Sequence, residues 1–261
     1  MTNTVELERS PVPEFHKVTF GTLLNAVRLG WRDFLRSFRC GIFFGGFYVI
    51  CAWIMAMVTV KTGETYWLVL AAFGFPLFAP FAAVGLYEIS HRLAEGTPIK
   101  TKEILGVVYR QRDRQIPSIS AIIIFIFLFW FFIAHMIFAL FLGFSTMTNI
   151  SSSLEVFFTP NGLSMLGIGT LVGAVLAFFV FSITVITLPL LLDRELDFVT
   201  AMLTSIGFVK DNLFMMLIWG GMISLTWFAA MVPWFLGVLI VLPVFGHASW
   251  HLYKTTVIEG T

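Results

Sequence analysis

Residues 213–253 read LFMMLIWGGMISLTWFAAMVPWFLGVLIVLPVFGHASWHLY, a stretch of the chain that contains no Asp, Glu, Lys or Arg. As one helix it would extend about 60 Å, because an α-helix rises about 1.5 Å per residue. That length is twice the hydrocarbon thickness of a bilayer, about 30 Å, so the stretch is predicted to cross a membrane twice. Pro233 is the expected turn, since proline interrupts the helical hydrogen-bond ladder. Trp227 and Trp234 flank it, as residues of an interfacial aromatic belt do.

The composition of the whole chain agrees with a membrane protein. Of 261 residues, 58% are hydrophobic and 12% are charged, and the mean hydropathy is +0.91. Soluble domains carry about 25% charged residues, roughly twice as many. The net charge of +1 and the lack of a dense basic run give no indication of a nucleic-acid partner. The partner that the composition predicts is the lipid bilayer.

Four further apolar runs have the length of roughly 20 residues that a transmembrane helix needs. Residues 1–19 are predicted to form a polar cytoplasmic tail, and residues 20–261 a single transmembrane domain. The fold class is therefore an all-α, polytopic membrane protein with six transmembrane helices. The predicted spans are approximately 41–60, 66–87, 121–144, 163–192, 213–232 and 234–253.

The basic residues predict the orientation of these spans. Fifteen of the 16 Lys and Arg residues lie in the tail or in every second gap between spans, and Lys61 alone falls on the other side. Cytoplasmic loops carry an excess of Lys and Arg, so both termini are predicted to be cytoplasmic. The short loop 61–65 and the loop 145–162 are then external.

Three segments outside the spans have apolar residues at helical spacing. They are residues 20–38, 101–113 and 198–210, and each precedes a pair of spans. We expect them to be amphipathic helices on the cytoplasmic surface of the membrane. Each contains or adjoins a basic residue followed by Asp, which suggests a threefold repeat of one amphipathic helix and two spans.

The candidate site residues are mostly histidines. Glu88 and His91 lie three residues apart at the end of the second span, and His247 and His251 lie four apart near the end of the sixth. If these spans adjoin, the four side chains have the chemistry of metal ligands. The alternative, which we favour, is that they are polar residues hydrogen-bonded at a membrane edge, with no metal, cofactor or catalytic residue. His135 is the ionisable residue inside a span, and we expect it to hydrogen-bond a neighbouring carbonyl.

Three sequence stretches together resemble a known family. They are residues 30–34 (GWRDF), residues 79–90 (APFAAVGLYEIS) and residues 246–253 (GHASWHLY). They are similar to a proteobacterial family of predicted integral membrane proteins catalogued as a domain of unknown function. The resemblance implies a multi-pass protein of the bacterial inner membrane, without an established activity. It also directs attention to Asp33, Glu88 and His247, which could tie the first amphipathic helix to the ends of spans two and six.

Some members of that family are loosely labelled as similar to cytochrome c oxidase subunit I. An oxidase core needs six histidine ligands, and this chain has 5 histidines, one of them in the tail. The sequence therefore does not support the label.

Two functions remain open from the sequence. The first is a non-enzymatic accessory or assembly component of a membrane complex, because no catalytic motif is recognisable and the predicted spans lack charged side chains. The alternative is a transporter or channel for a small apolar or weakly polar solute, for which Ser182, Thr184, Thr187 and His135 are the side chains that could begin a polar path. An enzyme with a site built from Asp33, Glu88 and the histidines ranks third.

Overall fold

The computed structural model describes residues 11–63, 68–143 and 154–258. Parts of the predicted tail (1–10), of the second span (66–67) and of the external loops (64–65 and 145–153) lie outside the described residues. The α-helices of the described residues, in chain order, are α1 (Phe20–Arg36), α2 (Phe38–Thr62), α3 (Leu68–Glu95), α4 (Thr101–Arg110), α5 (Ile116–Leu142), α6 (Pro160–Thr184), α7 (Thr187–Asp193), α8 (Phe198–Asp211), α9 (Leu213–Met231) and α10 (Val238–Thr256). Short 3-10 helices precede α5 and α6, namely η2 (Gln111–Asp113) and η5 (Leu154–Phe158).

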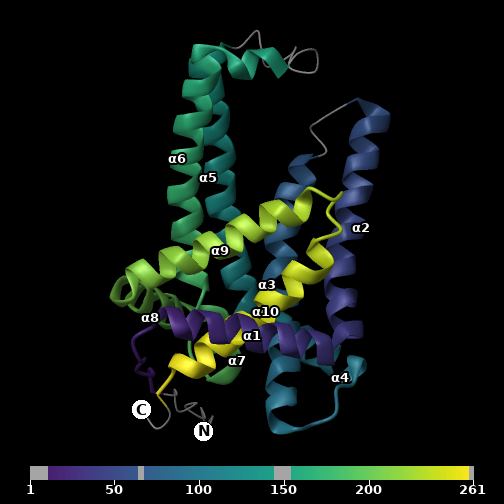
Figure 1. The fold of residues 1–261 in the computed structure, drawn as a ribbon, viewed down its shortest axis with the longest axis vertical. Coiled ribbons are helices and arrows are strands. Elements are labelled where there is room, and N and C mark those ends of the chain that lie inside the picture. Colours follow the sequence, from purple (N-terminus) through teal and green to yellow (C-terminus); the bar gives the residue numbers. More distant parts are fainter. Residues whose placement is uncertain (1–10, 64–67, 144–153, 259–261) are drawn as a thin grey trace, which may run out of the picture.

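The order of the helices confirms the predicted all-α architecture. Each of the predicted amphipathic segments is a helix (α1, α4 and α8), and each precedes two longer apolar helices. Figure 1 shows α2 with α3 and α5 with α6 along the long axis of the molecule, whereas α9 and α10 run obliquely across it. The third unit thus shares the helix order of the other two but not their arrangement, and internal homology stays a prediction. We call the end where α1, α4, α7 and α8 lie the basic end.

Four of the described helical segments have the length and apolar composition to cross a membrane. They are Phe38–Thr62, Ile116–Leu142, Pro160–Asp193 and Leu213–Met231. These correspond to predicted spans one, three, four and five. The second and sixth predicted spans are α3 and α10, so the six-span count stays a prediction. In α10 the second half carries polar residues, among them His247, His251 and Lys254, which lower its mean hydropathy.

Helix α1 has a buried face that packs within the protein and a second, exposed set of apolar side chains. Thr19 caps its first turn, accepting a hydrogen bond from the Thr22 backbone N–H at 3.1 Å. One face is buried against the rest of the chain and comprises Leu23, Ala26, Gly30, Asp33 and Phe34. Other large apolar side chains of this helix are exposed, namely Phe20, Leu24, Trp31 and Leu35. An exposed apolar face on a helix of this kind suits contact with a membrane surface.

The fourth predicted span is two helices, α6 and α7, with a break at Val185 and Ile186. The cause is Pro189, which has no N–H to donate to the carbonyl four residues earlier. The break also separates the Ile186 N–H from the Ser182 carbonyl, and the Ser205 hydroxyl of α8 bridges this pair by accepting from the N–H at 3.2 Å and donating to the carbonyl at 2.7 Å. The break thereby anchors the amphipathic helix α8 to the end of a span.

The turn between α9 and α10 falls where the proline predicted it, over residues 232–237. Trp234 and Phe235 have φ values of 52° and 64°, in the left-handed region that forms tight turns. The Trp53 indole N–H donates to the Trp234 carbonyl at 2.8 Å, which places the turn beside the middle of α2. Helix α2 continues for nine more residues, about 14 Å, to Thr62. The α9–α10 hairpin therefore stops well short of the far end of α2.

Candidate functional site: a buried polar cluster between α1, α3 and α10

Helices α1 and α10 pack antiparallel and unusually close at Gly30. A Cβ atom added there would lie 2.5 Å from the Val244 carbonyl oxygen and 2.7 Å from the Ala248 backbone nitrogen. Glycine is therefore required for the two backbones to approach. In the segment just before α1, the His16 N–H donates to the carbonyl of Thr256, the last residue of α10, at 2.8 Å. This packing carries the second half of α10 along α1 and brings its histidines to Asp33.

Asp33 is the centre of the cluster. Its side chain is fully buried, and its Oδ2 atom lies 2.6 Å from Nε2 of His251. Burial opposes ionisation of Asp33, but hydrogen bonds from His251 and Ser90 outweigh it, so the pKa of this carboxyl lies below its ordinary value. Arg32 adds a longer contact, 3.3 Å from its Nη2 to Asp33 Oδ1. A carboxylate buried in this way is stable only while its partners remain in place.

His247 joins the same cluster from the next turn of α10. It is fully buried, with Nδ1 at 2.8 Å from the Ser90 hydroxyl and Nε2 at 3.5 Å from the Ser37 hydroxyl. Ser90 uses its proton toward Asp33, so we assign the His247 ring proton to Nδ1, which donates to Ser90. Ser37 uses its own proton toward the Asp33 carbonyl at 2.7 Å. These five residues, Asp33, Ser37, Ser90, His247 and His251, are called the α1–α10 polar cluster below.

Glu88 and His91 lie outside this cluster. The Arg92 Nε atom donates to Glu88 Oε1 at 2.7 Å, and Arg92 Nη1 donates to Glu103 Oε2 at 2.6 Å, which ties α3 to α4. Hydrogen bonds to both carboxylates raise the pKa of Arg92 above its ordinary value. His91 pairs with Glu95 at 3.3 Å.

The four predicted candidates Glu88, His91, His247 and His251 are thus not brought together. Across residues 11–63, 68–143 and 154–258, no group of three or more His, Cys, Asp or Glu side chains is placed to hold a metal ion.

The polar side chains within the spans bond locally. His135 has Nδ1 at 2.7 Å from the Phe131 carbonyl oxygen, which is the predicted hydrogen bond to a neighbouring carbonyl. The hydroxyls of Ser182, Thr184 and Thr187 each donate to a carbonyl four residues earlier, at 2.7 Å. For Ser182 and Thr184 such bonds satisfy the hydroxyl within α6, whereas Thr187 also donates to the Ala201 carbonyl of α8 at 3.1 Å. None of these bonds connects to His135.

Sequence reasoning missed the two serines of the cluster and a further tie at Asp193. Ser37 lies four residues after Asp33, so i, i+4 spacing from Asp33 along the helical chain was an available signal. Asp193, at the end of α7, accepts from the Tyr253 hydroxyl at 2.6 Å and from Lys254 at 3.2 Å. Nothing local in the sequence relates Asp193 to residues sixty positions away.

The chemistry of the cluster is positional. Apart from His247 Nε2, which lies 3.5 Å from Ser37 with no proton between them, its donors and acceptors are directed at one another, and Asp33 and His247 have no exposed surface. A substrate would reach them only if α10 separated from α1. The arrangement instead fixes α1, α3 and α10 to each other at one level of the basic end.

These features define the class: an all-α integral membrane protein with several transmembrane-length helices. Residues 68–193, just under half of the chain, match the model of a family described as "Predicted integral membrane protein (DUF2189)". The match confirms the predicted resemblance to a family of unknown function. Of the three stretches that carried it, residues 79–90 lie inside the matched region. No curated protein and no solved structure matches the chain.

Proposed function

We propose that this protein is a non-enzymatic component of the bacterial inner membrane that works by associating with other membrane proteins, as an accessory or assembly subunit. Both termini lie in the cytoplasm in this proposal, which the distribution of the 16 Lys and Arg residues supports. The observation that carries the association is the surface of α5.

Helix α5 is the least covered of the candidate spans. In the most apolar 18 residues of α5, 6% is buried within the chain, whereas 50% of the corresponding stretch of the α6–α7 segment is buried. A shallow apolar groove runs along it, lined by Phe125, Leu128, Phe129, Phe132, Ile133 and Met136. Lipid alone can cover such a surface, so apolarity by itself does not identify a binding face.

His135 distinguishes this surface from a purely lipid-facing one. It is exposed, and it lies six residues from the middle of α5, about 9 Å along the axis, inside the half-thickness of about 15 Å. One ring nitrogen bonds the Phe131 carbonyl, and the other has no partner among the described residues. Ionisable residues inside membranes almost always face protein or water. A partner helix that donates a hydrogen bond to His135 would provide that environment.

The test is co-purification from native membranes in mild detergent, with wild type and His135→Leu compared by quantitative mass spectrometry. One interhelical hydrogen bond in a membrane contributes about 1–2 kcal/mol, so we expect the partner yield to fall roughly tenfold. His135→Gln, which keeps a hydrogen-bonding side chain, should retain most of it. Leu225→Ala, at an exposed position of α9, is the control. Equal partner yields for wild type and His135→Leu would contradict the proposal.

A further inference from the structure

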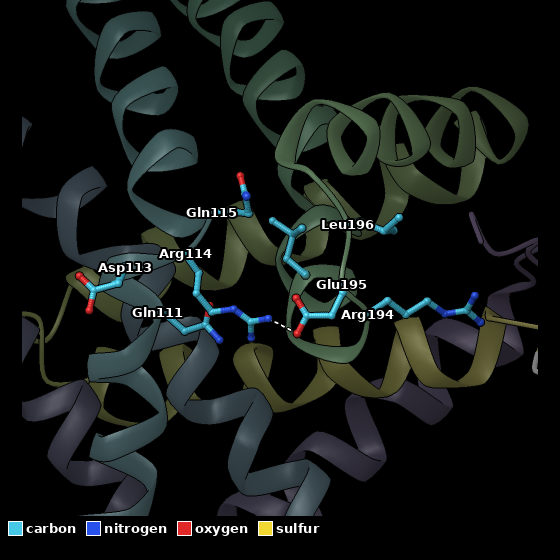
Figure 2. A pocket seen from close by; sticks show the side chains of 8 residues that line it. Gln111, Asp113, Arg114, Gln115, Arg194, Glu195 and Leu196 are labelled. Atoms are coloured by element: carbon cyan, nitrogen blue, oxygen red, sulfur yellow. Dashed lines mark hydrogen bonds and ion pairs between the residues drawn. The ribbon is translucent and has the colours of Figure 1, made fainter. Parts of the chain in front are cut away.

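A polar cavity of about 190 Å³ lies at the basic end, between the start of α5 and the connection from α7 to α8. Figure 2 shows this pocket and the side chains around it. The residues that line it are Gln111, Asp113, Arg114, Gln115, Leu191, Arg194, Glu195 and Leu196. It lies apart from the α1–α10 polar cluster and shares no residue with it.

One opposite-charge pair faces this pocket. Arg114, just before α5, forms an ion pair with Glu195, which lies between α7 and α8 (Figure 2). The other two charged lining residues point away from that pair in Figure 2 and are engaged elsewhere. Asp113 pairs with Arg112 at 3.2 Å, and Arg194 donates to the Pro11 carbonyl at 3.0 Å. The pocket therefore presents one guanidinium and one carboxylate side by side.

Gln111 is the residue that points to a ligand. It is 4% exposed, and its side-chain amide opens onto the pocket. Within the part of the chain that the structure describes, this amide makes no hydrogen bond. The amide is not among the buried unpaired atoms of the described residues, so it is the space of the pocket that supplies its hydrogen-bond partners. A ligand or ordered solvent in the pocket would supply the missing partners.

The position of the pocket restricts what that ligand is. Ile116 begins the apolar helix α5 and Asp193 ends the apolar segment Pro160–Asp193, so the pocket lies where two candidate spans leave the hydrocarbon region. Leu191 and Leu196, both buried, form its apolar lining. Lipid headgroups occupy this level of a membrane, and basic pockets between transmembrane helices bind them.

We propose that the pocket binds the headgroup of a zwitterionic phospholipid with a primary ammonium, such as phosphatidylethanolamine. The phosphate is matched by the Arg114 guanidinium and the Gln111 amide N–H groups, and the ammonium by the Glu195 carboxylate. An anionic headgroup without an ammonium leaves Glu195 facing like charge. A choline headgroup has no N–H to donate to Glu195 or to the Gln111 carbonyl. This inference does not depend on the proposed association through α5.

The experiment is native mass spectrometry of the full chain in mild detergent with equimolar phosphatidylethanolamine, phosphatidylglycerol and phosphatidylcholine. We expect phosphatidylethanolamine to be retained in preference to the other two. Gln111→Met removes the amide at nearly constant shape and should weaken its binding about tenfold, the effect of losing a hydrogen bond to a charged group. Lys102→Gln, an exposed position on α4 outside the pocket lining, is the control and should bind as wild type does.

Selectivity gives a second readout that does not depend on stability. Glu195→Gln removes the carboxylate and should shift retention from phosphatidylethanolamine toward phosphatidylglycerol. Equal retention of the three lipids by wild type would overturn the proposal, as would unchanged binding in a folded Gln111→Met. Soluble phosphoethanolamine that saturates the site at the same concentration as the lipid would overturn the assignment to a lipid headgroup.

Discussion

Replacing Gly30 with Ala should destabilise the protein, although Ala is the better helix former. In a free helix the change favours folding by about 1 kcal/mol. At Gly30 the new Cβ would lie 2.5 Å and 2.7 Å from backbone atoms of α10, against an ordinary contact distance of 3.4–4 Å. Backbone atoms cannot rotate away as a side chain can, so α10 must move by nearly 1 Å. Overpacking of this kind costs about 1–3 kcal/mol, and the shift also lengthens the Asp33–His251 hydrogen bond of 2.6 Å. Weakening that hydrogen bond costs about 1 kcal/mol more, so with about 2 kcal/mol of overpacking and about 1 kcal/mol gained in helix propensity the expected net loss is about 2 kcal/mol.

The assay is thermal unfolding in detergent, read by tryptophan fluorescence. At roughly 2–4 °C per kcal/mol for a chain of this size, the expected fall in Tm is about 4–8 °C. Gly207→Ala in α8 is the matched control, because nothing lies within 4 Å of a Cβ at that position. It should leave Tm unchanged or raise it. A Gly30→Ala protein as stable as the control would refute the close packing of α1 on α10.

Four further outcomes are expected. Asp33→Asn should lower Tm at pH 7. Because the fold depresses the pKa of Asp33, the stabilisation from its ionised carboxylate is present above the ordinary pKa of 3.8 and is lost as pH falls through the folded pKa. The Tm values of wild type and variant should therefore converge in acid and not in alkali. Purified protein should retain no stoichiometric metal, and the double variant His247→Ala, His251→Ala should not change its metal content by elemental analysis. Topology reporters at Glu155 and at the C-terminus should report opposite sides of the membrane, whereas reporters on one side would contradict the orientation. A cysteine at Val232, in a background without the two native cysteines, should resist an impermeant thiol reagent added outside, because the α9–α10 turn lies beside the middle of α2.

The helices were largely predictable because their signals are local. Apolar run length located α2, α5 and α9, and helical spacing located α1, α4 and α8. Pro233 located the last turn. The break at Val185 was not anticipated, although Pro189 is four residues later, because an uninterrupted apolar run conceals an interrupted helix.

The oblique path of α10 was not predictable from its own sequence. The expectation that residues 213–253 cross twice relied on length, and length does not give direction. Direction comes from the contact of Gly30 with Ala248 and from the hydrogen bond of Trp53 to Trp234. Both join segments about two hundred residues apart.

Part of the membership of the α1–α10 polar cluster was named from the sequence. His247 and His251 are in the cluster, and Asp33, noted through the family resemblance, is its centre. Glu88 was the wrong choice on α3, because Ser90, two residues later, faces His247 while Glu88 bonds Arg92. Helix–helix rotation decides which of two such neighbours faces inward, and one sequence does not fix that rotation.

The closure of α1 by α10 has a consequence for biogenesis. Asp33 meets His251 across 218 positions of sequence, and the buried face of α1 packs chiefly on this last helix. At about 5–20 residues per second, synthesis of the intervening chain takes on the order of 10–40 seconds. During that time α1 is complete and amphipathic, but Asp33 has no histidine to bind. Helix α1 must therefore wait on the membrane surface or with a chaperone until α10, synthesised about two hundred residues later, covers its buried face.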